Sequence, residues 1–160
     1  MIIIGYPGVG KTSLAGRYNQ YIDLESSHFN NAFGEKSSSW FIPYCRVAED
    51  LSKQGYRVFV SCHKEVQEYF SKSNEYVIVL YPALELKEQW LDRVKKRFEN
   101  EPSIKNAKAL ANVDEHYDIH IKSLMNSPFK NKLVLKDMNY TLDNEIDNVI
   151  WSERECGSEM

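Results

Sequence analysis

The sequence predicts an α/β fold, in which a five-stranded parallel sheet carries helices on both faces. Two observations predict it: short apolar runs alternate with amphipathic helical patterns along the chain, and a glycine-rich loop joins the first run to the first helix. The 160 residues suit one domain, and 42% hydrophobic and 27% charged residues are typical of a globular protein. We therefore expect residues 1–153 to form a single domain and residues 154–160 to be a frayed tail.

Five short apolar runs are the predicted strands. They are Ile2–Gly5, Tyr21–Leu24, Arg57–Ser61, Tyr76–Tyr81 and Lys132–Leu135. Each is followed by a helical pattern, and strands that alternate with helices are typical of βαβ units with a parallel sheet.

Helical patterns fill the intervals between these runs. They are Lys11–Tyr18, Trp40–Gln54, His63–Phe70, Leu84–Asn100, a long helix from Ser103 to about Met125, and Leu142–Trp151. In the fourth, Leu86, Trp90, Val94 and Phe98 recur every four residues. This spacing predicts one buried stripe on that helix.

Charge and cysteine content exclude several classes of protein. The net charge of −3 gives no overall field that would attract nucleic acid or an anionic membrane. The three cysteines, Cys45, Cys62 and Cys156, are too widely spaced for a disulfide framework or a zinc site. The first apolar run is too short for a signal peptide, and no stretch approaches roughly 18 apolar residues. We expect a cytoplasmic protein without a membrane partner.

The glycine-rich loop carries the chemistry. Residues Gly5–Thr12 match G-x-x-x-x-G-K-[ST], the P-loop motif, and lie after a strand and before a helix, as that motif requires. The loop predicts a three-layer P-loop NTPase fold that binds ATP and Mg²⁺. Lys11 is expected to reach the β- and γ-phosphates, and Thr12 to hold the metal. The residues expected to bind nucleotide here are Gly5, Pro7, Gly8, Val9, Gly10, Lys11, Thr12 and Ser13.

Two P-loop classes lack their further motifs in this chain. A motor ATPase needs a strand that ends in a carboxylate, but the strand with Val58–Val60 is followed by Ser61, Cys62 and His63. A GTPase needs an N-K-x-D sequence, and the segment Asn131–Val134 has no aspartate. Neither class is favoured.

The order and spacing of the motifs resemble the small P-loop kinases over nearly the whole chain. This group contains the nucleoside monophosphate kinases and the shikimate and gluconate kinases. In it the second strand ends in an acidic pair, which Asp23 and Glu25 match. The resemblance implies that Asp23 supports Mg²⁺ or orients the acceptor oxygen, and that Glu25 and Ser26 contact the acceptor. Alternation along an extended strand puts both carboxylates on one side, although solvated loop carboxylates are the alternative.

A pair of arginines lies on the helix after the fourth strand. Arg93 and Arg97 are four residues apart and therefore share a helical face. They match the R-x-x-x-R of the small kinases, which implies catalytic residues at a short lid over ATP, at about residues 93–108. Positive charge there would stabilise the migrating phosphoryl group. The solvated side of an amphipathic helix is the alternative.

The acceptor region departs from the adenylate kinase pattern. D-G-x-P-R is absent after the third strand, and Ser61, His63 and Lys64 occupy its place as predicted acceptor ligands. Residues 25–45 are expected to complete the acceptor region. In the small kinases the loop after the fifth strand cradles adenine, so Asn139 is a further predicted nucleotide contact.

The leading hypothesis is an ATP-dependent kinase that transfers the γ-phosphoryl group to a nucleoside or deoxynucleoside monophosphate. Two alternatives remain open: a kinase of a hydroxyl on a small metabolite or modified base, and a module that senses ATP without turnover. The expected partner is a small-molecule acceptor, and the protein is expected to be a monomer or a homodimer.

Overall fold

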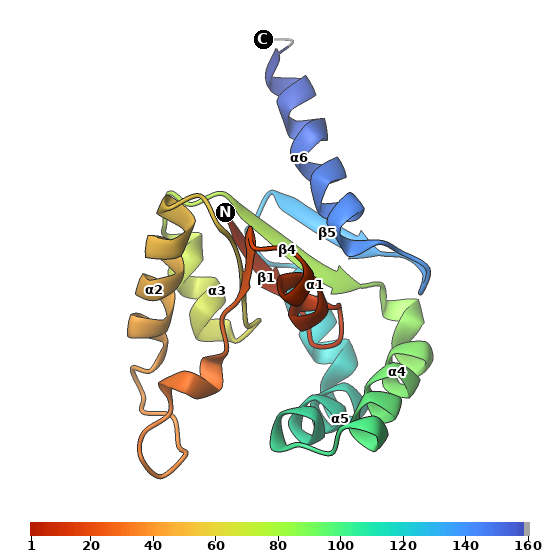
Figure 1. The fold of residues 1–160 in the computed structure, drawn as a ribbon. Helices are drawn as coiled ribbons and strands as arrows, with labels where there is room; N and C mark the ends of the chain where they lie inside the picture. Colours follow the sequence, from red (N-terminus) through yellow and green to blue (C-terminus); the bar gives the residue numbers. More distant parts are fainter. Residues whose placement is uncertain (159–160) are drawn as a thin grey trace.

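The structure is a computed structural model that describes residues 1–158, with side chains described for residues 1–154. Five strands form one sheet: β1 (Ile2–Gly5), β2 (Tyr21–Asp23), β3 (Arg57–Val60), β4 (Val77–Pro82) and β5 (Asn131–Leu135). The order is β2-β3-β1-β4-β5, and every neighbouring pair is parallel (Figure 1). The predicted fold class is confirmed.

Helices connect the strands: α1 (Lys11–Arg17), α2 (Phe41–Lys53), α3 (Lys64–Ser71), α4 (Lys87–Asn100), α5 (Ile104–Met125) and α6 (Leu142–Ser158), with short 3-10 turns η1 (Ser26–Phe29) and η2 (Leu84–Leu86). Because βαβ crossovers are right-handed, α1 lies on one face of the sheet and α2, α3 and α5 lie on the other. None of the described helices is long and apolar enough to cross a membrane.

The centre of the sheet is β1, which is buried on both faces. Ile2, Ile3 and Ile4 are fully buried, and Ile4 is in register with Val60 of β3 and Val79 of β4. A strand between two parallel neighbours needs apolar residues on both sides, which explains the unbroken isoleucine run. The carboxyl ends of β1, β2 and β3 therefore meet at one edge, where the glycine-rich loop begins.

Several element boundaries differ from the prediction. Of the predicted stripe, Leu86 at the end of η2 and Trp90 and Val94 of α4 are buried, but Phe98 is only partly buried. The long helix α5 has a non-helical residue at His116. Helix α6 continues to Ser158, although the sequence predicted its end at Trp151 and a frayed tail from residue 154. Residues 159–160 of that predicted tail lie outside the described part of the chain.

Candidate active site

The phosphate loop has the conformation that its glycines allow. Gly8 and Gly10 have φ angles of 89° and 110°, in the left-handed region that side chains disfavour. Gly10 caps α1, and Lys11 Nζ donates to the carbonyl oxygen of Gly5 at 2.8 Å. A Cβ on Gly8 would stand 3.0 Å from Trp90 Nε1, so this position needs glycine for space as well.

Three side chains hold successive carbonyl oxygens of residues 7–9. Trp90 Nε1 donates to Pro7 at 2.8 Å, Arg93 Nη1 to Gly8 at 3.3 Å, and the Tyr140 hydroxyl to Val9 at 2.8 Å. Peptide groups are planar, so each N–H points away from the carbonyl that precedes it. Fixing these carbonyls on one side therefore directs the N–H groups of residues 8–10 to the other side, where they can bind phosphate oxygens. Sequence reasoning placed none of the three donors in this role.

Carboxylates lie beside the lysine of the loop. Desolvation by the surrounding protein lowers the pKa of Lys11, and the charges of Asp23 and Glu25 oppose this shift. The Thr12 hydroxyl donates to Asp23 Oδ2 at 2.7 Å. A hydroxyl and a carboxylate in contact are hard oxygen donors of the kind that Mg²⁺ prefers, so these residues fit the predicted metal.

One lysine at this place was not predicted. Lys105 is in the first turn of α5. Its Nζ lies 3.4 Å from Thr12 Oγ1 and forms an ion pair with Glu25. In the sequence it is one of many lysines on polar helix faces, so spacing alone could not single it out.

A cavity of about 800 Å³ joins the phosphate loop to the ends of β2 and β3. Ten of the predicted site residues line it: Pro7, Gly8, Lys11, Thr12, Asp23, Glu25, Ser26, Ser61, His63 and Arg97. Lining residues outside that predicted set include Asn30, Glu35, Lys36, Lys105, Lys108 and Asn112. Lys64, predicted to bind the acceptor, is exposed at the start of α3 and does not line this cavity. No Phe, Tyr or Trp of the described residues lines it.

Ser61 and His63 form one polar unit at the end of β3. His63 Nδ1 is 2.7 Å from Ser61 Oγ, and the His63 ring packs edge-on against Trp40 with centroids 4.9 Å apart. Desolvation, followed by the charge of Lys36, lowers the pKa of His63. The imidazole is therefore neutral at pH 7 and can accept or donate a hydrogen bond.

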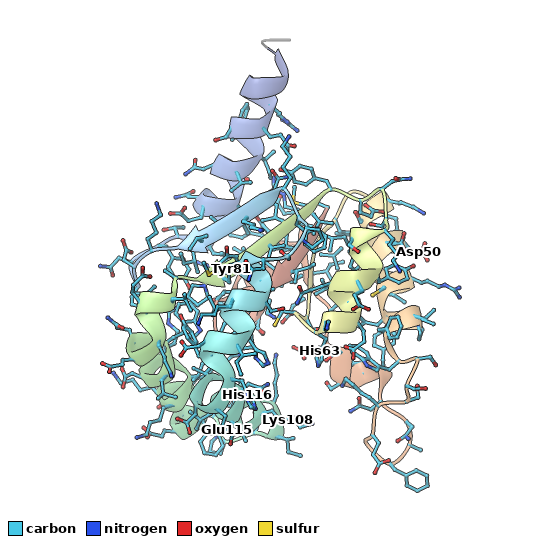
Figure 2. The ribbon with its side chains drawn as sticks, turned by 180° about the vertical axis from the view of Figure 1, so that it is seen from behind. Asp50, His63, Tyr81, Lys108, Glu115 and His116 are labelled. Atoms are coloured by element: carbon cyan, nitrogen blue, oxygen red, sulfur yellow. The ribbon has the colours of Figure 1, made fainter. Side chains whose placement is uncertain are left out.

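Two lysines face this cavity without a carboxylate partner. Lys36 donates to Asn30 Oδ1 at 2.8 Å, and Lys108 lies on α5. Within the described residues neither forms an ion pair, and the charge of Lys108 adds to burial in lowering the pKa of Lys36. Figure 2 shows His63 at the start of α3 and Lys108 on α5, which line the cavity from two elements.

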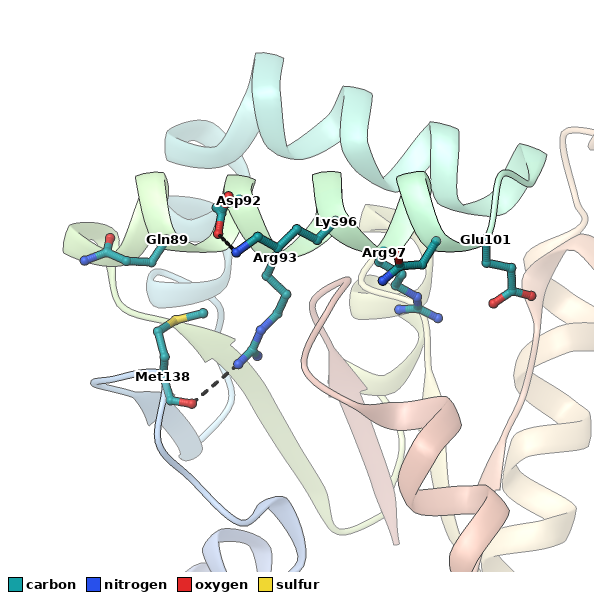
Figure 3. A pocket seen from close by; sticks show the side chains of 8 residues that line it. Gln89, Asp92, Arg93, Lys96, Arg97, Glu101 and Met138 are labelled. Carbon is teal, nitrogen blue, oxygen red and sulfur yellow. Dashed lines mark hydrogen bonds and ion pairs between the residues drawn. The ribbon is translucent and has the colours of Figure 1, made fainter.

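The two predicted arginines both line a cavity of about 660 Å³ along α4, but their other contacts differ. Arg97 lines the main cavity, whereas Arg93 donates to Gly8, to the Tyr140 hydroxyl at 2.6 Å and to the carbonyl of Met138 at 3.4 Å. Figure 3 shows both on α4, with Arg93 directed toward Met138. Arg93 thus joins the phosphate loop to the β5–α6 loop, and the shared helical face does not give the two residues one role.

The β5–α6 loop meets the phosphate loop through residues other than the predicted one. Asn139 is exposed, and its N–H donates to Asp137 Oδ1 at 2.9 Å. Tyr140 and Ser13 instead line a smaller cavity of about 400 Å³ beside Arg93. Met138 and Tyr140, rather than Asn139, are the residues of this loop that contact Arg93.

A second metal site is not supported on α5. The His116 and His120 rings lie 5.6 Å apart, but no group of three His, Cys, Asp or Glu side chains among the described residues could hold a metal ion.

The sheet order and the strand–loop–helix unit define a P-loop fold. A shikimate kinase from Bacteroides thetaiotaomicron has a similar structure, with a TM-score of 0.48 and 10% sequence identity over 98% of this chain and 97% of that chain. No protein-family model and no curated protein matches the sequence.

Proposed function

We propose that this protein transfers the γ-phosphoryl group of ATP to a small-molecule acceptor. The observation that carries the proposal is the single cavity in which Lys11 and Thr12 of the phosphate loop face Asp23, Glu25, and the residues after β3. The phosphates of the donor and the acceptor could then lie in contact within one cavity, shielded from bulk water. A loop that only bound nucleotide would need no such second compartment.

The donor half would bind the triphosphate with residues already in place. The N–H groups of residues 8–10 and Lys11 would hold the β- and γ-phosphates, and Arg97 would reach the migrating group. Thr12 and Asp23 would hold Mg²⁺, which neutralises phosphate charge when bound. Arg93, next to Met138 and Tyr140, would contact the base side of the nucleotide.

The acceptor half favours a hydroxyl on a small polar metabolite. Its lining is rich in hydrogen-bonding side chains and, among the described residues, holds no Phe, Tyr or Trp ring on which a nucleobase would stack. Asp23 and Glu25 would lie next to the transferred group, where carboxylates repel an accepting group that is itself anionic but can orient a hydroxyl and receive its proton. Lys36 and Lys108 would bind an anionic group elsewhere on the same molecule.

A nucleoside monophosphate, the acceptor favoured by the sequence, is the second candidate. The observation in its favour is that Lys36 and Lys108 line the cavity and form no ion pair within the described residues, so both could bind the acceptor phosphate. An acceptor that is already ionised needs no strong base.

The deciding experiment measures ADP release from Mg²⁺-ATP in the presence of two acceptor panels: nucleoside monophosphates and anionic hydroxylated metabolites. We expect acceptor-dependent ADP with the second panel. ADP formation only with the first panel would support the nucleotide candidate. No acceptor-dependent ADP with either panel, despite tight ATP binding, would contradict a kinase and favour an ATP-sensing module.

A variant of Asp23 distinguishes a hydroxyl acceptor from a monophosphate acceptor. With a hydroxyl acceptor, Asp23→Asn should reduce kcat by about 10²–10⁴-fold even at saturating Mg²⁺. With a monophosphate acceptor it should mainly raise the Mg²⁺ concentration that is needed. The control is Asp50→Asn, which makes the same change on the exposed part of α2, away from the cavity (Figure 2).

A further inference from the structure

The first turn of α5 brings an ammonium group to the proposed metal ligands. Lys105 Nζ lies 3.4 Å from Thr12 Oγ1 and pairs with Glu25, while Thr12 itself donates to Asp23 at 2.7 Å. An ammonium and a divalent cation need the same kind of oxygen ligand. Lys105 therefore stands where Mg²⁺ would have to approach.

The backbone that carries this lysine is fixed, whereas its side chain is not enclosed. Ser103 Oγ accepts from the Asn106 N–H at 3.1 Å, and Asn106 Nδ2 donates to the carbonyl of Glu101 at 2.8 Å. These bonds hold the turn between α4 and α5, and Asn106 is buried. The Lys105 side chain is 49% exposed, and its flexible stem can swing away without moving the helix.

Without nucleotide, the charged groups around Thr12 carry no net negative charge. The ammonium groups of Lys11 and Lys105 offset the carboxylates of Asp23 and Glu25, and Arg97 adds a further positive charge from the cavity wall. A divalent cation that arrives alone meets no net negative charge. Nucleotide phosphates bring several negative charges and would change that balance.

We infer that the Lys105 ammonium group blocks the approach of Mg²⁺ to Thr12 and Asp23 in the nucleotide-free protein and withdraws when the metal–nucleotide complex binds. The inference rests on the proposed function, because it takes Thr12 and Asp23 as the metal ligands. Its consequence is that the free protein binds divalent metal weakly, so that metal and nucleotide enter together.

The test is a titration of the full chain with Mn²⁺, as a probe for Mg²⁺, without nucleotide, followed by calorimetry or electron paramagnetic resonance. Lys105→Met should tighten Mn²⁺ binding by about fivefold, as expected for removal of one partly exposed competing charge. Lys105→Arg keeps the charge and should bind Mn²⁺ as weakly as the parent chain. Lys122→Met removes an exposed charge from the far end of α5 and should also leave the Mn²⁺ affinity unchanged.

A purely structural ion pair would give another pattern. In that case Lys105→Met would lower the midpoint of thermal unfolding without tightening Mn²⁺ binding, and this result overturns the inference. Equal tightening in Lys122→Met would overturn it as well, because any lost charge would then suffice. A parallel titration with ADP tests the proposed function: Mn²⁺ that fails to bind even with ADP would overturn both proposals.

Discussion

The phosphate loop and the loop of residues 30–36, here called the acceptor wall, are two sides of one cavity, but they are held in different ways. Carbonyls of residues 7–9 receive hydrogen bonds from α4 and from the β5–α6 loop, more than 80 residues away in the chain. In the acceptor wall, Asn31 Oδ1 instead accepts from the N–H groups of Phe33 and Glu35, at 2.9 and 3.0 Å. The donor side is thus shaped by the whole fold, whereas the acceptor wall is held mainly by hydrogen bonds within its own loop.

In the proposed phosphotransferase, this difference would serve two separate requirements. The triphosphate site must be formed in advance, because fixed donors stabilise the migrating charge without reorganisation. The acceptor wall can adapt to its ligand, because its bonds are local and its residues are largely exposed. Variants on each side should therefore affect different measured quantities.

The largest effect is expected at the lysine of the phosphate loop. Lys11→Met should reduce kcat by about 10³-fold, because it removes the one cation that the loop itself aims at the phosphates. The measurement is acceptor-dependent ADP release by protein whose circular dichroism is unchanged. Lys53→Met, on the exposed end of α2, is the control. Full activity in Lys11→Met would contradict the proposed function.

The next comparison separates the two arginines of α4. Arg97→Met should lower kcat by about 10²-fold, because Arg97 faces the cavity in which transfer would occur. Arg93→Met should instead raise the Kd for ATP by about tenfold, because it frees the Gly8 carbonyl and the Tyr140 hydroxyl. Binding and turnover are measured separately for each variant. Identical effects of the two substitutions would contradict the different roles.

The next prediction concerns the hydrogen bond that Trp90 donates to the phosphate loop. Trp90→Phe retains a ring in the core but loses the hydrogen bond to Pro7, and should lower the free energy of unfolding by about 1–2 kcal/mol. ATP affinity should fall with it. Urea unfolding and ATP titration give both values, with Trp151→Phe as the exposed control. A loss of stability with full ATP affinity would show that this hydrogen bond does not shape the phosphate loop.

The acceptor wall should respond in the opposite way. Asn31→Ala removes the side-chain acceptor for two N–H groups of an exposed loop and should lower the free energy of unfolding by only about 0.5 kcal/mol. The KM for the acceptor should rise severalfold while the KM for ATP stays constant. A change in both KM values would mean that the two sides are not independent.

The smallest effect concerns pH. Because the folded pKa of His63 is lowered, the unfolded chain binds more protons below about pH 6.5, so stability falls as the pH drops through that value toward the folded pKa. His63→Gln should flatten this dependence in urea unfolding between pH 7.5 and 5. His28→Gln, at an exposed position in η1, is the control. An unchanged slope in His63→Gln would exclude this contribution.

Much of the donor side could be predicted from sequence because its signals are local. Residues 5–12 fix the loop by motif, and the alternation of apolar runs fixes the strands that present it. The partners of the loop cannot be predicted in this way: the sequence pattern places Trp90 only in a buried stripe and Tyr140 only in a loop after β5. Both predictions describe a local pattern, whereas the role depends on which distant carbonyl each side chain meets.

On the acceptor side, too, position in the sequence predicts only some of the residues that line the cavity. Ser61 and His63 were found by their place after a strand, but Lys64 follows them in sequence and turns away with the start of α3. The sequence does not distinguish three lining residues, Lys36, Lys105 and Lys108, from other surface lysines. The packing of α5 brings Lys105 and Lys108 to the cavity.

The sequence by itself determined the α/β class, the strand positions and the phosphate loop with Lys11 and Thr12, because hydrophobic period and glycine conformation act over a few residues. Only the tertiary structure decided that Arg93 supports the loop while Arg97 faces the cavity, and that Lys105 reaches Thr12 and Glu25. These are contacts between residues 80 or more positions apart, and their geometry follows from how helices pack on the finished sheet.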